Sequence, residues 1–213
     1  MKISILYDNT SRRQDMEASW GFSALVESEN ETVLFDAGGE WDILKENMKA
    51  MEVDPGIIDR IVISHDHWDH QGGLNGLLKS IDVPVHIPKS FETDVYSKRV
   101  WVEGGPRKIC QGIHTTGELG NFEQSIMIDV KGGVFMVVGC SHPGLSRILD
   151  EGSRMGKVIG VVGGFHDFSE LSRLRDLELI IPTHCTQRID DIRRMYPEKY
   201  MRGGAGTVIE MDS

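Results

Sequence analysis

Short apolar segments recur along the whole chain, and most of them are rich in valine and isoleucine. Segments of this length and β-branched content are typical of β-strands. We predict strands at residues 3–7, 22–26, 32–35, 61–63, 83–87, 125–130, 134–138, 157–162, 179–181 and 207–211. Other segments repeat apolar residues every three or four positions, which predicts helices at 41–51, 73–80, 145–155, 170–174 and 188–196. The chain is therefore predicted to be a mixed α/β protein.

Paired glycines lie near the ends of several predicted elements, where glycine punctuates the chain and lets a backbone approach a ligand. The pair Gly132-Gly133 follows Lys131 between two apolar segments and predicts a hairpin, so part of the sheet system should be antiparallel. No Ser/Pro-rich linker, low-complexity tract or short repeat interrupts the pattern. With 213 residues, of which 39% are hydrophobic, we predict a single domain that spans residues 1–213.

The formal net charge is −10 at pH 7, which repels polyanions and argues against nucleic acid as a partner. A metal pocket can still attract a small anionic substrate, and we expect a partner of that kind. The N-terminal segment lacks the pattern of a signal peptide, and no apolar run approaches the roughly 20 residues of a membrane span. The three cysteines, Cys110, Cys140 and Cys185, have no CxxC spacing and fit reduced thiols. We expect a cytoplasmic protein without a membrane partner, and the sequence leaves its oligomeric state open.

The most informative stretch directly follows the predicted strand 61–63. It places three histidines and an aspartate within six positions: His65, His67, Asp69 and His70. Imidazole and carboxylate groups together suit borderline divalent metals such as zinc. His65 and His67 are two residues apart and can point the same way, whereas the two later residues can face a second ion. The alternative, a polar loop with solvated histidines, explains this density of ligand-type residues poorly.

Two isolated histidines occur in the same strand-end context. His142 lies in the segment GCSHPG at 139–144, and His184 lies in PTHCT at 182–186. Alone, each could be a helix-capping or buried structural histidine. Together with the first cluster, they are predicted to be further metal ligands. His86 and His114 lie inside strand patterns and are predicted to be structural.

The pattern His65-x-His67-x-Asp69-His70, followed by isolated histidines at strand ends, resembles the metallo-β-lactamase superfamily. The resemblance runs from about residue 3 to 211 and implies an αβ/βα sandwich of two facing mixed sheets with helices on the outer faces. It implies one ion held by His65, His67 and His142, and a second held by Asp69, His70 and His184. Zinc is the implied cofactor, as one or two ions, with manganese, iron or magnesium as alternatives.

Asp36 ends the predicted strand 32–35 and matches the aspartate that supports the ligand loop from behind in this family. A narrower likeness rests on five segments, namely LYDN at 6–9, WGFS at 20–23, GCSHPG at 139–144, GGFH at 163–166 and PTHCT at 182–186. These segments resemble the dihydropterin-aminobenzene-phosphate synthases of methanopterin-type cofactor biosynthesis. Within the first segment, Asp8 and Asn9 could support the metal loops or form a turn.

The narrower likeness implies a metal-dependent synthase that transfers a pterin group. Because the same cluster permits hydrolysis, the first alternative is a metal-dependent hydrolase of a small phosphodiester, lactone or thioester. The second alternative is a metal-binding sensor without turnover. In both enzymatic interpretations we expect Asp69 to be a catalytic residue as well as a ligand.

The segment 163–167 departs from the family pattern. Most dinuclear members of the family carry an acidic bridging ligand after a strand between the third and last histidines, but here that strand ends in Gly-Gly-Phe-His-Asp. We predict that His166 faces the site as a substrate-binding or acid/base group. Asp167 as a substitute ligand, and His166 as an ordinary loop residue, are the alternatives.

Overall fold

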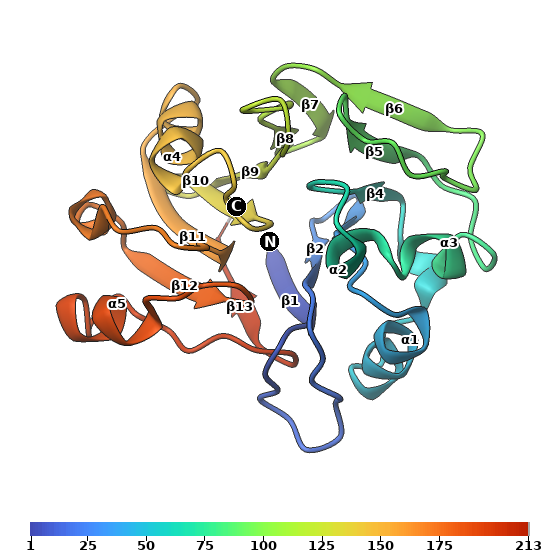
Figure 1. The fold of residues 1–213 in the computed structure, drawn as a ribbon, viewed down its shortest axis with the longest axis horizontal. Helices are drawn as coiled ribbons and strands as arrows, with labels where there is room; N and C mark the ends of the chain where they lie inside the picture. The colour runs from blue at the N-terminus through green and yellow to red at the C-terminus, as the bar shows by residue number, and fades with distance from the viewer. Residues whose placement is uncertain (213) are drawn as a thin grey trace.

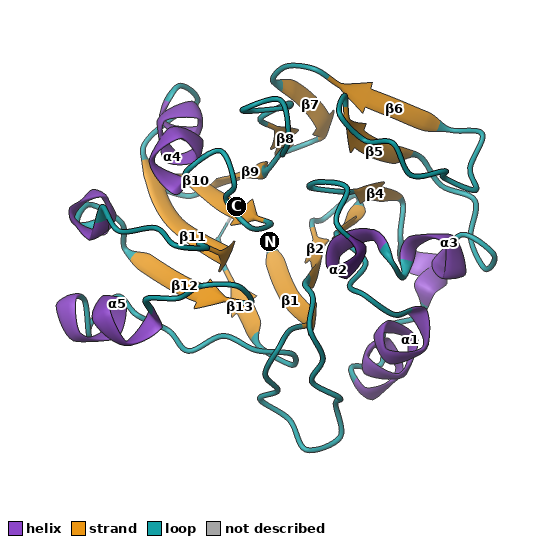
Figure 2. Cartoon of the chain, in the orientation of Figure 1, coloured by secondary structure: helices purple, strands orange, loops and turns teal. Residues whose placement is uncertain are grey.

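The computed structural model describes residues 1–212 and contains two β-sheets packed face to face between two layers of helices. Figure 1 shows α1, α2 and α3 outside one sheet and α4 and α5 outside the other, and Figure 2 shows the strands between these two helical flanks. The predicted α/β sandwich is thereby confirmed. Among the described residues, no helix has the length and apolar character of a membrane span.

The first sheet has seven strands in the order β13-β1-β2-β3-β4-β5-β6. Their bounds are β13 (Val208–Glu210), β1 (Lys2–Tyr7), β2 (Ser23–Glu27), β3 (Thr32–Phe35), β4 (Arg60–Val62), β5 (Val85–Pro88) and β6 (Val100–Glu103). The pairs from β13 to β3 are antiparallel, and those from β3 to β6 are parallel.

The second sheet has six strands in the order β12-β11-β10-β9-β8-β7. Their bounds are β12 (Leu179–Thr183), β11 (Val158–Gly164), β10 (Gly133–Val138), β9 (Ile126–Val130), β8 (Ile113–Thr115) and β7 (Arg107–Cys110). The three strands β10, β11 and β12 are parallel, and the remaining pairs are antiparallel. The predicted hairpin is confirmed, because Val130 of β9 pairs with Gly133 of β10.

The helices connect strands and cover the outer faces. They are α1 (Trp41–Ala50), α2 (Trp68–Gln71), α3 (Leu74–Leu77), α4 (Leu145–Ser153) and α5 (Ile189–Met195), with 3₁₀ turns η1 (Pro55–Ile57) and η2 (Leu171–Leu174). The predicted helix 170–174 is therefore a 3₁₀ turn.

Of the predicted helix 73–80, only α3 (Leu74–Leu77) is helical, and a separate single-turn helix, α2, interrupts the chain before it and was not predicted. The interruption has a visible cause in the backbone. The carbonyl of Asp69 accepts the amide of Phe22 at 3.2 Å, and the carbonyl of His70 accepts the amide of Ala37 at 2.7 Å. These carbonyls would otherwise accept amides one turn further along a continuous helix. The same bonds anchor the histidine-rich loop to the first sheet.

Successive residues along a strand contribute alternately to the inner core between the sheets and to one of two outer cores. In β10, Phe135 and Val137 lie in the core between the sheets, whereas Met136 and Val138 pack in the outer core with α4. Because successive strand residues point to opposite faces, a continuously apolar strand can fill both layers. This explains why most buried strands read as unbroken apolar runs.

Strands β6 and β7 were not predicted, and of β8 only His114 was predicted as a strand position. In β6, Val100, Trp101 and Val102 are all exposed, at the edge of the first sheet. Its sequence Val-Trp-Val-Glu is nevertheless an apolar, β-rich run, so exposure at the sheet edge does not erase the strand pattern.

Replacing Phe135 by alanine should lower the free energy of unfolding by about 3–5 kcal/mol, because its buried ring fills the space between the sheets. Denaturant unfolding followed by circular dichroism measures the change. The exposed Val100→Ala is the control and should change stability by less than about 0.5 kcal/mol. An equal effect of both substitutions would contradict the assigned core.

Candidate metal centre

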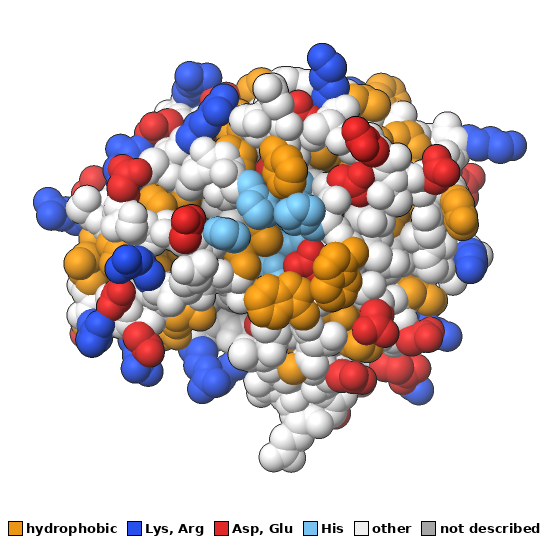
Figure 3. Space-filling view, viewed as in Figure 1, with side chains coloured by type: hydrophobic (Ala, Val, Ile, Leu, Met, Phe, Trp, Pro, Cys, Tyr) orange, Lys and Arg blue, Asp and Glu red, His pale blue; other side chains and the backbone are white. Residues whose placement is uncertain are grey.

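The histidine cluster lies where the carboxyl ends of strands from both sheets meet. His65, His67 and His70 follow β4, while His142 follows β10 and His184 follows β12. Histidine side chains gather near the middle of one face of the molecule, with hydrophobic side chains beside them (Figure 3). The structure thus brings together all six residues predicted as ligands.

Asp36 organises the first ligand loop. It is fully buried, and its Oδ1 accepts the backbone N–H of Ser64 at 2.6 Å. Its Oδ2 accepts the Ser64 hydroxyl at 2.8 Å and His70 Nδ1 at 2.7 Å. Since the hydroxyl hydrogen is used on Asp36, Ser64 Oγ accepts His65 Nδ1 at 2.8 Å. One carboxylate therefore sets the tautomers of two histidines and leaves the Nε2 lone pair of each free.

Asp8 and Asn9 hold and orient His184 in the same way. Asp8 Oδ1 accepts the backbone N–H of His184 at 2.8 Å, and Asn9 Nδ2 donates to its carbonyl at 3.0 Å. Asn9 Oδ1 lies 2.9 Å from His184 Nδ1 and can accept its proton. Burial raises the pKa of Asp8 to about 6. Both predicted roles occur: these bonds support the His184 loop, and Asp8 Oδ2 also accepts the backbone amide of Thr10 at 3.0 Å in a local turn.

Glu123 holds the third loop, and sequence reasoning missed it. Its buried carboxylate accepts the backbone amides of Cys140 at 3.0 Å, Ser141 at 2.9 Å and His142 at 2.8 Å. Burial raises the pKa of Glu123 despite these bonds. No local motif marks the residue, because its partners lie 17 to 19 positions further along the chain.

Acceptor atoms face one another at the centre of the cluster. His70 Nε2 lies 3.2 Å from His184 Nε2, and His65 Nε2 lies 3.0 Å from His67 Nδ1. Asp36 and Asn9 set the tautomers of His70 and His184, so the Nε2 atoms of both rings present lone pairs to each other. A proton or a metal cation must therefore lie between these two atoms. Nitrogens bound to one tetrahedral zinc at about 2.0–2.1 Å lie roughly 3.3 Å apart. Both the donor types and their spacing therefore fit a metal ion.

Asp69 completes the second group of predicted ligands. Its Oδ2 lies 3.4 Å from His184 Nε2 and 4.0 Å from His70 Nε2, and it accepts the indole N–H of Trp20 at 2.8 Å. Sequence reasoning noted Trp20 only as part of a motif and assigned it no contact with the site. The indole bond orients the carboxylate toward the histidines.

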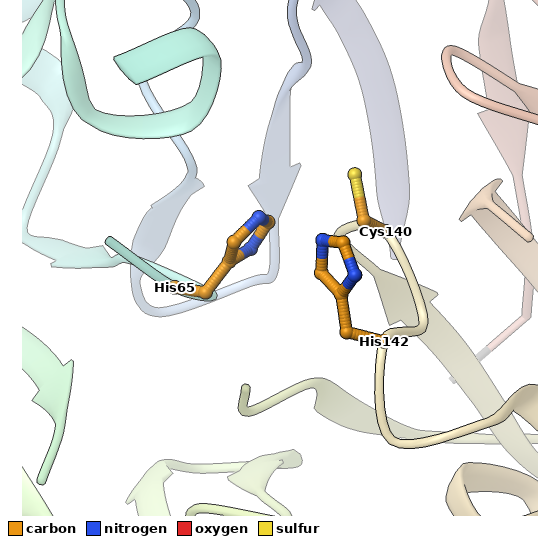
Figure 4. A group of neighbouring side chains, drawn as sticks. All are labelled: His65, Cys140 and His142. Carbon is orange, nitrogen blue, oxygen red and sulfur yellow. The ribbon is translucent and has the colours of Figure 1, made fainter. Parts of the chain in front are cut away.

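Cys140 joins both halves of the cluster. The ligand atoms of His65, Cys140 and His142 lie within 4.8 Å of one another, and so do those of His70, Cys140 and His184. Cys140 Sγ is only 3.1 Å from His70 Nε2. Figure 4 shows Cys140 and His142 extending from one loop and His65 from another, all toward a common space.

Protonation states follow from burial and from neighbouring charges. Burial, together with His67 and His166, lowers the pKa of His142 to about 4. Burial also holds the pKa of His65 well below its usual value. Burial tends to raise the pKa of Asp69, but its hydrogen bond with His184 and the neighbouring histidine charges hold it below its usual value. Neutral imidazoles and an ionised carboxylate are the forms that bind metals.

His70 and Cys140 differ from these groups. Burial would lower the pKa of His70, but Asp36 outweighs it and the pKa is raised. A hydrogen bond with Cys185 and burial raise the pKa of Cys140, so its thiol is protonated at neutral pH without a cation. Both groups must lose a proton to serve as ligands.

Strained backbone accompanies the cluster. Asp36, Ser141, His166 and His184 have φ values between 47° and 61°, in the left-handed region that non-glycine residues rarely adopt. Such conformations persist where surrounding bonds over-determine them, and they concentrate at functional sites. The buried carboxylates supply such bonds to three of these four segments.

His166 lies at the margin of the cluster. It is half-buried, its ring centroid is 5.1 Å from that of His142, and its Nδ1 is 3.4 Å from Asp167. Asp167 is exposed and belongs to neither group of close ligand atoms. His86 is buried against Glu103 at 2.7 Å, and His114 contacts Asp129 at 3.2 Å, so both lie outside the cluster.

Comparison with known proteins agrees with this geometry. The model of the metallo-β-lactamase superfamily matches residues 21–184. An uncharacterised protein of Methanocaldococcus jannaschii is 30% identical over 232 residues, covering 86% of this chain and 90% of the relative. The 7,8-dihydropterin-6-methyl-4-(β-D-ribofuranosyl)-aminobenzene-5′-phosphate synthase of the same organism is 27% identical over 262 residues, covering 89% of each chain. A crystal structure of a metal-dependent hydrolase of the β-lactamase superfamily superposes with a TM-score of 0.80 at 25% identity, covering all of both chains.

Replacing Glu123 by glutamine should lower the free energy of unfolding by about 1–3 kcal/mol, because the new amide N–H₂ would face a buried backbone N–H. Denaturant unfolding of the metal-free protein measures the loss. The exposed Glu198→Gln is the matched control and should leave stability unchanged. Wild-type stability of the Glu123 variant would show that the carboxylate does not hold the loop.

Proposed function

Because the chain belongs to the metallo-β-lactamase superfamily, we propose that it is a metal-dependent enzyme that condenses a dihydropterin diphosphate with an aminobenzene ribosyl phosphate. The observation that carries this proposal is a cluster of converging histidine lone pairs bordered by exposed aromatic side chains. The relative at 27% identity, a synthase that makes a dihydropterin linked to an aminobenzene, supports the choice of substrates.

The metal would be held by His65, His67 and His142 on one side and by Asp69, His70 and His184 on the other. This donor set is rich in imidazole, which suits zinc better than magnesium, since magnesium prefers oxygen ligands. When bound there, divalent cations would offset the negative charge that develops on a departing diphosphate.

Three exposed aromatic residues border the histidines. Trp20, Trp68 and Phe122 are 53%, 59% and 36% exposed. The ring of Phe122 lies 5.0 Å from that of His142, and the ring of Trp20 lies 5.3 Å from that of His184. Exposed aromatic side chains at the entrance of a polar site favour a planar ring that can stack on them. A pterin and an aminobenzene both meet this requirement.

A cavity of about 500 Å³ lies beside the loop that carries His184, on the side of Asp8 and Asn9. Its walls include Arg193 and Arg202. Arg193 is paired with Asp190 at 3.1 Å, whereas Arg202 has no ion pair among residues 1–212. A guanidinium group in this position can bind a phosphate, which supports a phosphorylated second substrate.

The proposed reaction breaks the bond between the pterin methylene carbon and the diphosphate oxygen, and forms a bond from that carbon to the amine nitrogen. Diphosphate leaves, and the amine loses one proton. His166 is suited to accept this proton, since it lies beside His142 and remains open to solvent. Asp69, fixed by the Trp20 indole, would act beside the metal.

A hydrolase of a small phosphodiester, lactone or thioester is the second candidate. The similarity to a structure of a metal-dependent hydrolase, at 25% identity and a TM-score of 0.80, favours it. A non-catalytic metal sensor would keep the same ligands without turnover.

Purified protein supplied with zinc, manganese or magnesium should form a condensation product from dihydropterin diphosphate and aminobenzene ribosyl phosphate. Mass spectrometry of the product and release of diphosphate measure the reaction, with chelator-treated protein as the control. Absence of product with every metal would reject the synthase, and turnover of a phosphodiester, lactone or thioester would then assign a hydrolase. Inactivity on all of these substrates would favour the sensor.

Replacing His166 by alanine should leave the metal content near that of wild type but lower turnover by about 10²–10⁴-fold, because an acid/base group is lost. Elemental analysis and kcat measure the two effects separately. His114→Ala, a histidine outside the cluster, is the control and should change neither. Loss of an ion from the His166 variant would instead make His166 a ligand.

A further inference from the structure

Strand β11 cannot bring a carboxylate to the centre of the cluster, because it ends in two glycines with no room for a side chain. A Cβ atom on Gly163 would lie 1.9 Å from the carbonyl oxygen of Val138. On Gly164 it would lie 2.5 Å from the carbonyl oxygen of Gly139 and 2.6 Å from Cys185 Sγ. Contacts this short require the backbone to move. An acidic bridging ligand is therefore sterically excluded from these two positions.

A different side chain occupies the space between the two groups of ligands. Cys140 is 4% exposed, and its Sγ lies within 4.8 Å of ring nitrogens of His65 and His142 on one side and of His70 and His184 on the other. Among residues 1–212, these are the two close ligand groups, and Cys140 is the member that they share. Glu123 fixes its backbone through the Cys140 amide.

We propose that Cys140 is a thiolate ligand shared by the two metal sites. This inference rests on the proposal that the cluster binds metal. On binding, the S–H bond breaks and its proton passes to solvent, while the sulfur lone pairs form bonds to the metal. A sulfur atom has the lone pairs for two such bonds. The shared sulfur would hold the two ions at a fixed separation.

Cys185 is the nearest competitor for this role. Its Sγ contacts the carbonyl oxygen of Cys140 at 3.8 Å, and it belongs to neither close ligand group. It fills the space beside Gly164 and so packs behind Cys140. Cys110 lies in β7, in the core between the sheets. The chain thus supplies two cysteines as matched controls.

Cobalt(II) substitution tests the assignment, because a thiolate bound to cobalt(II) absorbs in the near ultraviolet by charge transfer. The full-length protein, stripped with a chelator and loaded with cobalt(II), should bind two ions per chain and show this band. Cys140→Ser should lose the band and bind cobalt(II) at least about 10- to 100-fold more weakly. This is the loss of metal affinity that follows removal of a group that supports a ligand. The single variants Cys185→Ser and Cys110→Ser should keep both the band and the stoichiometry.

The double variant C110S/C185S retains Cys140 as its one thiol, so its band decides the question even if Cys140→Ser does not fold. Persistence of the band in this variant supports the proposal. Loss of the band in Cys185→Ser would assign the thiolate to Cys185 and overturn it. Cobalt(II) bound by wild type without a thiolate band would overturn it while leaving the metal site intact. Failure to bind cobalt(II) at all would reject both this inference and the proposed metal-dependent function.

Discussion

The close approach of two buried histidine lone pairs, those of His70 and His184, is the constraint on which the structure of the centre depends. Asp36 and Asn9 fix the tautomers of His70 and His184, so two acceptor nitrogens face each other at 3.2 Å. Buried acceptors that face each other repel unless a cation lies between them. Protonation of His70 can satisfy this pair alone, but the nearby thiol and carboxylate make a metal ion the better match for the whole set.

Three buried carboxylates make this arrangement stable enough to persist. Asp36, Glu123 and Asp8 each accept backbone amides from a different loop, and the three loops follow β4, β10 and β12. The burial of these acids is unfavourable, as the raised pKa values of Asp8 and Glu123 indicate. The bonds that offset this cost also hold backbone in left-handed conformations at the site. The loops are therefore pre-organised by the fold before any ion binds.

The features of the fold and site that depend on neighbouring residues could be predicted from the sequence. Apolar periodicity located most buried strands, and the spacing of His65, His67 and His70 located the site. Edge strand β6 was missed although Val100 to Val102 is an apolar run. The break between α2 and α3 was missed because the carbonyls of Asp69 and His70 bond to amides of distant residues, Phe22 and Ala37. Glu123 was missed for a similar reason. Its role depends on amides brought to it by sheet packing, which leaves no mark in the neighbouring sequence.

The two glycines that end β11 and the cysteine beside them are parts of one local arrangement. Gly164 lies so close to Gly139, Cys140 and Cys185 that a side chain there would push the loop after β10 away from the cluster. The absence of a side chain lets that loop approach, and the approach brings Cys140 Sγ to 3.1 Å from His70 Nε2. A carboxylate on this strand and a thiol in this loop would compete for the same volume. Glycine at position 164 thus supplies no donor itself and, by the same packing, makes room for the soft thiol donor of Cys140.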